Sequence, residues 1–524
     1  MELAQRHWGL LIALLLASLI LIPYSTVELG RDQANWLTIA MALENGSVLY
    51  RDVAFVNTPG LGVLYLIINK LFGNPEITPW VTHVLTILLT LIAGYAFARK
   101  IYGPNEAAWA VIVTALLWPL SMDWWEVGQK DLGAFTLALC SAAVLAWSGA
   151  RRKHDIAAGA LLALAILFKT TGVVYAAPLA VQLYFSSKSF KEFFSRGLWM
   201  AAGGIGMAAL PLIYFLWHGA LGNAWDSLVQ RGSAYGGFNR MSPGIILYEL
   251  SIFLFQSLGL VAVLPLFRLL SMKQDDRRFL PMGLFILTTI ALVFLQGRAW
   301  FYHMVPFIAA WSLGAGICLG HVISHGKQWL RISSLAVFGI TLVYTWGNMD
   351  LRWYKYANYM AGNVSYSEHQ KLFEEHLALN MNWMAPHSES RQIGELIRNN
   401  TTPQDRIFVW GMESQIYVYA DRMFIGPSFN DAPIWHPQLA EIKPDYFMEK
   451  RSLFFSALQE TPPAYFVIAR DDANPVEPIP SDISLFSMPE FARFIQDNYT
   501  PVMGTRYFIV LEHNQREPEA MPGT

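Results

Sequence analysis

The sequence predicts a polytopic α-helical membrane protein with a small C-terminal extracytoplasmic α/β domain. Hydrophobic residues make up 54% of the 524 residues and charged residues 15%, whereas a typical soluble domain has about 25% charged residues. Apolar runs long enough to cross a bilayer recur as far as residue 347, since a span needs about 20 helical residues. The composition therefore excludes a soluble globular enzyme and a disordered chain.

Net charge and cysteine content exclude further classes. The formal net charge of −2 provides no basic surface for nucleic acid, so we expect no nucleic-acid partner. Cys140 and Cys318 both lie in apolar runs. Two dispersed cysteines are too few for a disulfide framework or a cysteine metal site.

The apolar runs predict about eleven membrane-spanning helices. With a cytoplasmic N-terminus, the basic groups at 99–100, 151–153 and 277–278 all lie in cytoplasmic loops, as the positive-inside rule requires. This orientation in the cell inner (plasma) membrane places residues 348–524 outside the cytoplasm. Residues 155–186 form either two short helices or one bent helix, and a bent helix would move every later loop to the other side. The predicted spans are residues 8–28, 79–98, 105–121, 131–149, 155–168, 171–186, 197–218, 244–270, 279–296, 300–324 and 331–347.

The C-terminal region has the pattern of a water-soluble domain. From Ser388 onward, helical and strand patterns alternate, which indicates a small α/β domain. We predict helices over 388–400 and 489–498, and strands over 406–411, 415–420, 464–470 and 506–512. The chain thus divides into a transmembrane domain (1–347), a connector (348–387) and an extracytoplasmic, periplasmic domain (388–524).

Two loops on the predicted outer face are rich in polar residues. The first, residues 29–78, contains an amphipathic stretch, 34–43, and an apolar segment, 61–72, that is too short to span. We expect both to be helices that lie in the membrane interface. The second, residues 121–131, also holds Trp124 and Trp125, a pair typical of an aromatic belt. The polar residues of interest in the two loops are Arg31, Asp32, Tyr50, Arg51, Asp52, Glu126, Lys130 and Asp131.

Further charged residues lie within or beside the predicted spans. Lys169 separates two apolar runs, and a lone intramembrane cation indicates a functional site, although it can also snorkel to the surface. Arg298 precedes Tyr302 and His303. A lone histidine there would be a core residue, but beside Arg298 it favours an anion-binding site. Asp32 and Asp131 can each alternatively be a helix N-cap.

Carboxylates and cations on one face of the membrane suit one kind of chemistry. A carboxylate can accept the proton of a hydroxyl that attacks a sugar carbon. Cations can stabilise the charge that develops on a departing phosphate. No GxxxxGK[ST] motif occurs, so nucleotide triphosphate hydrolysis is not indicated. If the phosphate belongs to a membrane lipid, no soluble nucleotide site is needed.

The chain resembles the polytopic GT-C glycosyltransferases that use polyprenyl-phosphate sugars, which include protein O-mannosyltransferases and lipid A aminoarabinose transferases. The family's Asp-Glu pair is Asp32-Gln33 here, and its Lys-Pro-Pro is Asn57-Thr58-Pro59, so the resemblance leaves the sugar open. The segments that carry it are Arg31-Asp32-Gln33, Tyr50-Arg51-Asp52, Thr58-Pro59-Gly60, Asp131 with Phe135, Leu167-Phe168-Lys169-Thr170-Thr171-Gly172, Gln296-Gly297-Arg298 with Tyr302, His303 and Pro306, and Asp405-Arg406-Ile407-Phe408-Val409-Trp410-Gly411.

The resemblance implies a role for each of these residues. Asp32 would be the base on the acceptor hydroxyl in an inverting transfer. Asp131 would position the acceptor or, with Asp32, hold a divalent metal; metal use stays open. The donor would be a polyprenyl-phosphate sugar, such as an undecaprenyl-phosphate sugar, and the acceptor a glycan, lipid or protein in cell-envelope, lipopolysaccharide or glycan biosynthesis. The residues expected to bind the donor phosphate are Lys169, Arg298, His303, Lys130 and Tyr302, and those expected to bind substrate are Arg31, Tyr50, Arg51, Asp52 and Glu126.

Two other classes of membrane protein remain as alternatives. A multi-span transporter also has many spans and lone intramembrane charges, but the halves of this chain show no evident repeat. An O-antigen ligase or polymerase would share lipid-linked substrates, but we would expect one large outer loop in the middle of the chain. The longest such loop here is 219–243.

Overall fold

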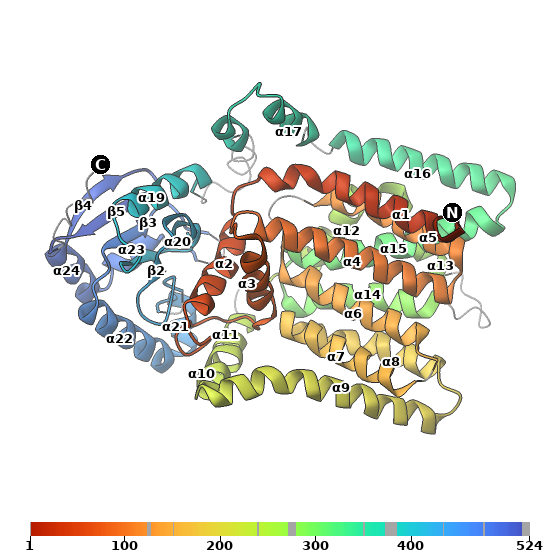
Figure 1. The fold of residues 1–524 in the computed structure, drawn as a ribbon, viewed down its shortest axis with the longest axis horizontal. Coiled ribbons are helices and arrows are strands. Elements are labelled where there is room, and N and C mark those ends of the chain that lie inside the picture. Colours follow the sequence, from red (N-terminus) through yellow and green to blue (C-terminus); the bar gives the residue numbers. More distant parts are fainter. Residues whose placement is uncertain are drawn as a thin grey trace.

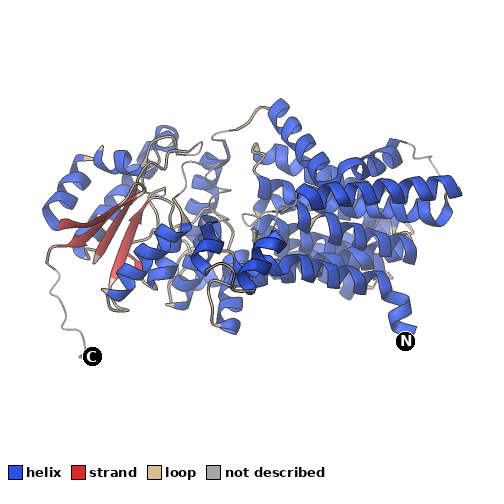
Figure 2. Ribbon diagram, turned by 90° about the horizontal axis from the view of Figure 1, so that it is seen from above, coloured by secondary structure: helices blue, strands red, loops and turns tan. Residues whose placement is uncertain are grey.

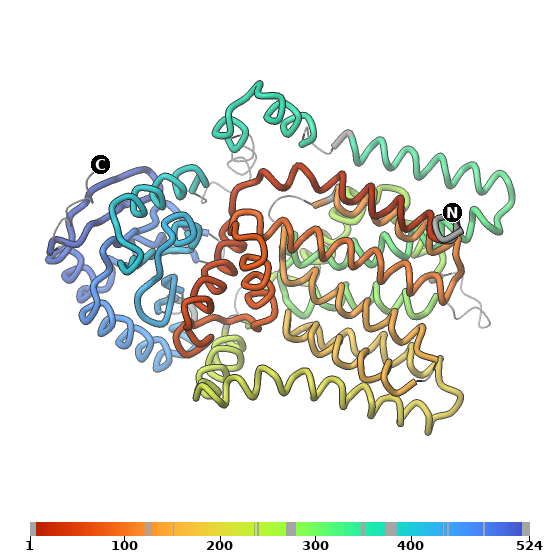
Figure 3. Tube along the Cα trace, viewed as in Figure 1, coloured from red at the N-terminus to blue at the C-terminus, as the bar shows by residue number. Residues whose placement is uncertain are grey.

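The fold consists of a helical bundle and a sheet-containing C-terminal domain, with short helices between them (Figure 1). In this computed structural model the described residues are 2–122, 127–149, 151–237, 240–270, 279–348, 352–371, 385–432, 434–474 and 477–515. The N-terminus lies at the end of the bundle away from the C-terminal domain (Figure 3). A second view shows the same division, with all the strands at the other end of the molecule (Figure 2).

The bundle contains the predicted spans. By length and composition, seven of the described helical segments can cross a membrane, and the remaining apolar helices of the bundle are shorter. Each of the eleven predicted spans coincides with one helix or one broken helix. The longer segments are α1 (Glu2–Leu21) with η1 (Ile22–Thr26), α4 (Thr78–Ile101), α6 (Lys130–Trp147), α9 (Phe190–Trp217), α12 (Pro243–Leu258) with η6 (Gly259–Ala262) and α13 (Val263–Leu270), α15 (Phe301–His325) and α16 (Gln328–Asn348). The shorter ones are α5 (Pro104–Leu117) with η2 (Pro119–Ser121), α7 (Arg152–Phe168), η4 (Thr170–Tyr175) with α8 (Ala176–Phe185), and α14 (Leu280–Gln296).

Residues 155–186 form two antiparallel helices. Arg196 on α9 donates from Nε to Asp155 Oδ2 at 3.1 Å and from Nη1 to Ser186 Oγ at 2.8 Å. Asp155 is near the start of α7 and Ser186 follows the end of α8, so these two ends lie side by side. One continuous helix would separate them by about 45 Å. The alternative of one bent helix is therefore wrong.

Two helices cross the end of the bundle that faces the C-terminal domain (Figure 1). They are α2 (Arg31–Glu44) and α3 (Gly60–Phe72), as the first outer loop predicts. Helix α3 exposes Val63, Ile67 and Leu71, which suits an interfacial helix. Helix α2 instead is buried along most of its length, because the C-terminal domain covers it. Three short helices lie at the same end: α10 (Leu221–Trp225), the π-helix η5 (Asp226–Arg231) and α11 (Gly232–Gly237).

The C-terminal domain is built on one five-stranded sheet of order β2-β1-β3-β5-β4. Strand β1 is parallel to β2 and β3, and β5 is antiparallel to β3 and β4. The strands are β1 (Arg406–Trp410), β2 (Met423–Phe424), β3 (Tyr465–Ala469), β4 (Tyr499–Gly504) and β5 (Phe508–His513). The helices are α19 (His387–Asn399), α20 (Gln415–Ala420), α21 (Pro437–Ile442), α22 (Pro444–Glu460), α23 (Ser481–Phe486) and α24 (Pro489–Asn498).

One predicted strand is wrong. Residues 415–420 form helix α20, not a strand, although their aromatic and β-branched composition is typical of strands. All six residues are buried. The segment therefore lacks the alternation of apolar and polar residues that distinguishes a strand from a helix. The region assigned to the connector also contains a helix, α17 (Arg352–Met360).

A hydrophobic cluster joins the crossing helices to the C-terminal domain. It includes Trp36 and Leu37 of α2 together with Ile393, Ile416 and Tyr417 of the domain. Polar contacts follow the same surface: Arg31 forms an ion pair with Glu413, and Ser414 Oγ donates to Asn35 Oδ1 at 2.6 Å. The C-terminal domain thus fixes the position of helix α2.

Candidate active site

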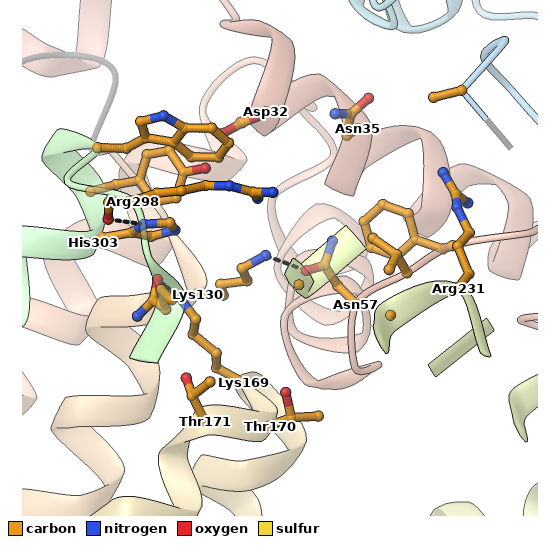
Figure 4. Close-up of a pocket in the computed structure, with 18 of the residues that line it drawn as sticks. Asp32, Asn35, Asn57, Lys130, Lys169, Thr170, Thr171, Arg231, Arg298 and His303 are labelled. Carbon is orange, nitrogen blue, oxygen red and sulfur yellow. Dashed lines mark hydrogen bonds between the residues drawn. The ribbon is translucent and has the colours of Figure 1, made fainter. Parts of the chain in front are cut away.

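A cavity of about 350 Å³ lies where the bundle, the crossing helices and the C-terminal domain meet (Figure 4). This volume is typical of small-molecule sites. Among the described residues, four cationic side chains and two carboxylates line it: Lys130, Lys169, Arg231, Arg298, Asp32 and Glu477. The excess of positive charge suits an anionic ligand.

Lys169 enters the cavity from the turn between α7 and α8, where its extended backbone (φ −154°, ψ 123°) ends the helix. Its Nζ donates to Gln296 Oε1 at 2.8 Å and forms an ion pair with Asp131. The side chain is only 12% exposed, so it does not snorkel to the surface. Lys169 is instead a buried cation held at a fixed point.

Asp131 lies in the first turn of α6 and is not among the residues that line the main cavity. It is 3% exposed and lines a smaller cavity with Tyr175 and Pro306. Gln129, not Asp131, is the N-cap of α6. The ion pair with Asp131 holds the ammonium group of Lys169 in place.

Arg298 is held by a group of aromatic residues in the segment that begins α15. It is 5% exposed, and its guanidinium lies 5.0 Å from the ring centre of Trp300. His303 Nδ1 donates to the carbonyl oxygen of Arg298 at 3.1 Å, and its ring stacks on Trp300. Tyr302 packs against His303 with ring centres 4.5 Å apart. All four residues line the cavity.

Lys130 is the first residue of α6 and lies on the same side of the cavity as Arg298 (Figure 4). Its Nζ donates to Asn57 Oδ1 and lies 5.7 Å from the ring centre of Trp36. Lys130, Lys169 and Arg298 therefore reach one cavity from three different segments of the chain.

Asp32 provides a carboxylate at the edge of this cationic group. It lies in the first turn of α2, whose N-cap is Gly30, and it accepts a hydrogen bond from Gln129 Nε2 at 3.1 Å. Burial away from water raises the pKa of Asp32. Nearby Lys130 and the hydrogen bond from Gln129 lower this pKa, but they offset the effect of burial only in part. The Asp32 carboxyl is therefore a stronger base than an ordinary aspartate.

Four residues predicted to bind substrate do not line the cavity. Arg31 points from α2 to Glu413 in the C-terminal domain, and Tyr50 is buried, with its hydroxyl donating to the Asn57 carbonyl at 2.8 Å. Arg51 and Asp52 form an exposed ion pair at 2.8 Å. The structure thus places these four residues outside the lining of the cavity, and their role in substrate binding stays a prediction. Glu126, Trp124 and Trp125 lie outside the described residues.

The C-terminal domain supplies one wall of the cavity. Asn430, His436 and Glu477 line this wall. Arg231, the last residue of η5, also lines the cavity (Figure 4). Burial, together with nearby Asp472, raises the pKa of Glu477 to about 7. These residues are remote in sequence from both outer loops, so no local motif could have identified them.

A metal at Asp32 and Asp131 was left open by the sequence. Lys169 is paired with Asp131 and Lys130 lies close to Asp32, so each carboxylate already has a cationic neighbour. In the part of the chain that the structure describes, three metal-ligating side chains come together elsewhere, at Glu106, His321 and His325.

Comparison with known proteins confirms the resemblance to GT-C glycosyltransferases. Residues 56–215 match the model of a family described as dolichyl-phosphate-mannose-protein mannosyltransferase. This stretch contains Asn57, Lys130, Asp131 and Lys169. A search of curated proteins found no match.

Solved structures share the fold over nearly the whole chain. ArnT from Cupriavidus metallidurans bound to undecaprenyl phosphate has a TM-score of 0.62 at 16% identity, covering 96% of this chain and 98% of that one. The apo state of ArnT has a TM-score of 0.61 at 16% identity, covering 97% and 98%. An Archaeoglobus fulgidus oligosaccharyltransferase tethered with an acceptor peptide has a TM-score of 0.51 at 11% identity, covering 98% and 75%. The predicted fold class, a GT-C membrane protein with a small C-terminal α/β domain, is confirmed.

Proposed function

We propose that this chain, which has the GT-C fold, is an integral membrane glycosyltransferase that moves a sugar from a polyprenyl-phosphate donor to an acceptor hydroxyl. The observation that carries the proposal is the convergence of Lys130, Lys169 and Arg298 on one cavity whose edge holds Asp32. The likeness to ArnT bound to undecaprenyl phosphate supports a lipid phosphate as the ligand of these cations.

The three cations would bind the phosphate of the donor and stabilise it as the leaving group. When the bond between the anomeric carbon and the phosphate oxygen breaks, that oxygen gains negative charge. Cationic donors that are already in place stabilise this charge without reorganisation. Gln296 and Asp131 orient Lys169, and Trp300 orients Arg298, by the contacts described above.

Asp32 would act as the base. The acceptor oxygen attacks the anomeric carbon from the side opposite the phosphate, its proton passes to the Asp32 carboxylate, and the polyprenyl phosphate leaves with the bonding electrons. This displacement inverts the anomeric centre. The wall formed by Asn430, His436 and Glu477 would contact the sugar or the acceptor, which is a glycan, a lipid or a protein.

We place this reaction on the outer face of the inner (plasma) membrane. The basic residues 99–100 lie in the last turn of α4, and residues 151–153 lie at the start of α7. Both groups are at the end of the bundle away from the cavity (Figure 1), and the positive-inside rule assigns that end to the cytoplasm. The N-terminus would then be cytoplasmic and the C-terminal domain extracytoplasmic.

The test is donor turnover in nanodiscs. The full chain is mixed with a panel of polyprenyl-phosphate hexoses and pentoses, with and without a crude envelope extract as acceptor, and free polyprenyl phosphate is measured. We expect one donor to be consumed and Asp32→Asn to abolish this release. Glu44→Gln is the matched control, because Glu44 lies at the far end of the same helix, where it faces the exposed Lys70 at 3.8 Å.

Two outcomes would overturn the proposal. Release that is unchanged in Asp32→Asn would remove Asp32 from the reaction. No release from any donor, with the protein folded and binding none of the lipids, would favour the transporter alternative.

A further inference from the structure

A second group of chemically active side chains lies at the opposite end of the bundle from the cavity. Glu106 is near the start of α5, and His321 and His325 are one turn apart near the end of α15. Their ligand atoms all lie within 4.8 Å of one another. Since His303 at the start of α15 lines the cavity, His321 is about 27 Å farther along the same helix. This group is therefore separate from the candidate active site.

The spacing of these three side chains fits a metal ion better than direct hydrogen bonds. Glu106 Oε1 lies 3.8 Å from His321 Nδ1 and 3.5 Å from His325 Nε2, beyond the usual hydrogen-bond range of about 2.7–3.2 Å. Ligands that surround Zn²⁺ tetrahedrally at about 2.0–2.2 Å are about 3.3–3.6 Å from one another. The observed separations therefore leave room for an ion between the three groups.

The backbone holds the two helices in this arrangement. Gly316 and Gly320 of α15 face α5 so closely that a Cβ on Gly320 would lie 2.8 Å from the Cα of Glu106, and one on Gly316 would lie 2.5 Å from the Cα of Ala110. Next to the group, Asn105 Nδ2 donates to Ser324 Oγ at 3.4 Å. Because the helices are fixed by backbone contact, the three ligands are preorganised.

We propose that Glu106, His321 and His325 bind a divalent transition-metal ion such as Zn²⁺ and that the ion clamps α5 to α15. The two histidine side chains are 48% and 64% exposed and Glu106 is 8% exposed, so an ion can enter and keep water as a fourth ligand. Two imidazoles and one carboxylate are a ligand set that zinc commonly uses. The positive charge of Arg268 on α13 acts on His321 and opposes the binding of a cation there. The negative charge of the Glu106 carboxylate offsets this repulsion.

The test measures metal binding to the purified full chain, stripped with EDTA and carrying no histidine tag. Equilibrium dialysis with Zn²⁺, followed by elemental analysis, should give one ion per chain, and Zn²⁺ should raise the Tm. His321→Ala, His325→Ala and Glu106→Gln should each lower the affinity by at least about tenfold, since each removes one of three ligands. His154→Ala is the matched control, because His154 lies near the same end of the bundle and bonds to the Ser148 carbonyl instead.

A spectroscopic measurement covers the case in which a variant does not fold. Co²⁺ bound to the wild-type chain should give the intense visible bands of a tetrahedral complex. His325→Cys, which keeps three ligands, should add a thiolate charge-transfer band in the near ultraviolet. No stoichiometric binding, equal binding by the His321→Ala/His325→Ala double variant, or no new band in a folded His325→Cys would overturn the proposal. None of these experiments measures sugar transfer, so their outcome is independent of the test of the proposed function.

Discussion

Lys169 enters the cavity with its ammonium group already held by Asp131 and Gln296. A buried cation with no counter-charge would be costly, and Asp131 reduces that cost without blocking the cavity. The residue's importance is predictable from the sequence, because a lone lysine between apolar runs is conspicuous. Its partner is not predictable, because Asp131 is 38 residues away and could equally have been a helix cap.

Replacing Lys169 should weaken the binding of lipid phosphate. Lys169→Met removes one charge-assisted contact worth about 1.5–3 kcal/mol, so we expect the Kd for polyprenyl phosphate to rise about 10- to 100-fold. Binding can be measured by calorimetry in detergent. Lys70→Met is the control, since Lys70 is exposed and outside the cavity. An unchanged Kd in a folded Lys169→Met protein would remove Lys169 from the phosphate site.

The raised pKa of Asp32 should appear in the pH dependence of the reaction. A base must be deprotonated, so the rate should fall as pH falls through the pKa of Asp32, and the midpoint should lie above the ordinary value of 3.8. Lys130 lowers this pKa, so Lys130→Gln should move the acid limb of the rate profile to higher pH. The measurement is kcat/KM against pH, because that profile reports the groups of the free enzyme. An acid limb that stays in place in Lys130→Gln would contradict the proximity of these two charges.

At the scale of elements, helix α2 illustrates what a local pattern can and cannot predict. Its helical conformation and the position of Asp32 follow from the sequence. The neighbouring Arg31 was predicted to bind substrate, but it faces Glu413. Adjacent residues on a helix point in directions about 100° apart, and only the presence of the C-terminal domain decides which of them faces the cavity.

Disruption of the contact between Arg31 and Glu413 should affect the chemical step more than donor binding. Burial raises the pKa of Glu413, opposed by Arg31, and removing one partner of a buried pair costs about 3–5 kcal/mol. We expect Glu413→Gln, which keeps the shape, to lower kcat while the Kd for lipid phosphate changes less than about twofold. Arg506→Gln is the control, because Arg506 forms an exposed pair with Asp471. Equal losses in kcat and donor affinity would argue against a role in positioning Asp32.

The close packing of α7 against α9 gives a second prediction at this scale. A Cβ at Gly203 would lie 1.9 Å from the carbonyl oxygen of Ile156, whereas one at Gly206 on the same helix would meet no atom within 4 Å. Gly203→Leu should therefore destabilise the bundle by about 1–3 kcal/mol, and Gly206→Leu should not. The Tm in detergent, followed by tryptophan fluorescence, distinguishes the two. Equal Tm values would show that the helices can separate at no cost.

At the scale of the whole molecule, composition predicts the division into a membrane part and a C-terminal α/β part. The run lengths and the charge pattern identify the spans because the bilayer imposes them on every segment separately. The cavity wall of Asn430, His436 and Glu477 could not be predicted, because it depends on how two parts of the chain dock. No period or motif encodes that contact.

The two parts should unfold together. They share one hydrophobic cluster, which runs from α2 to Tyr417, and interfaces of this kind couple the stability of adjacent domains. Calorimetry of the full chain in detergent should therefore show one cooperative transition, at a Tm that rises when polyprenyl phosphate is added. Two well-separated transitions would show that the C-terminal domain is only loosely attached.

The cationic cavity has a consequence for what happens after transfer. A lipid-linked sugar carries its phosphate as a diester with a single negative charge, whereas the spent carrier is a monoester with about −1.5 to −2 charges at neutral pH. The same three side chains, Lys130, Lys169 and Arg298, would therefore hold the spent carrier more tightly than the donor. Product inhibition follows from this charge difference. The pace of successive turnovers would then be set by how quickly the spent carrier diffuses away within the bilayer and is recycled.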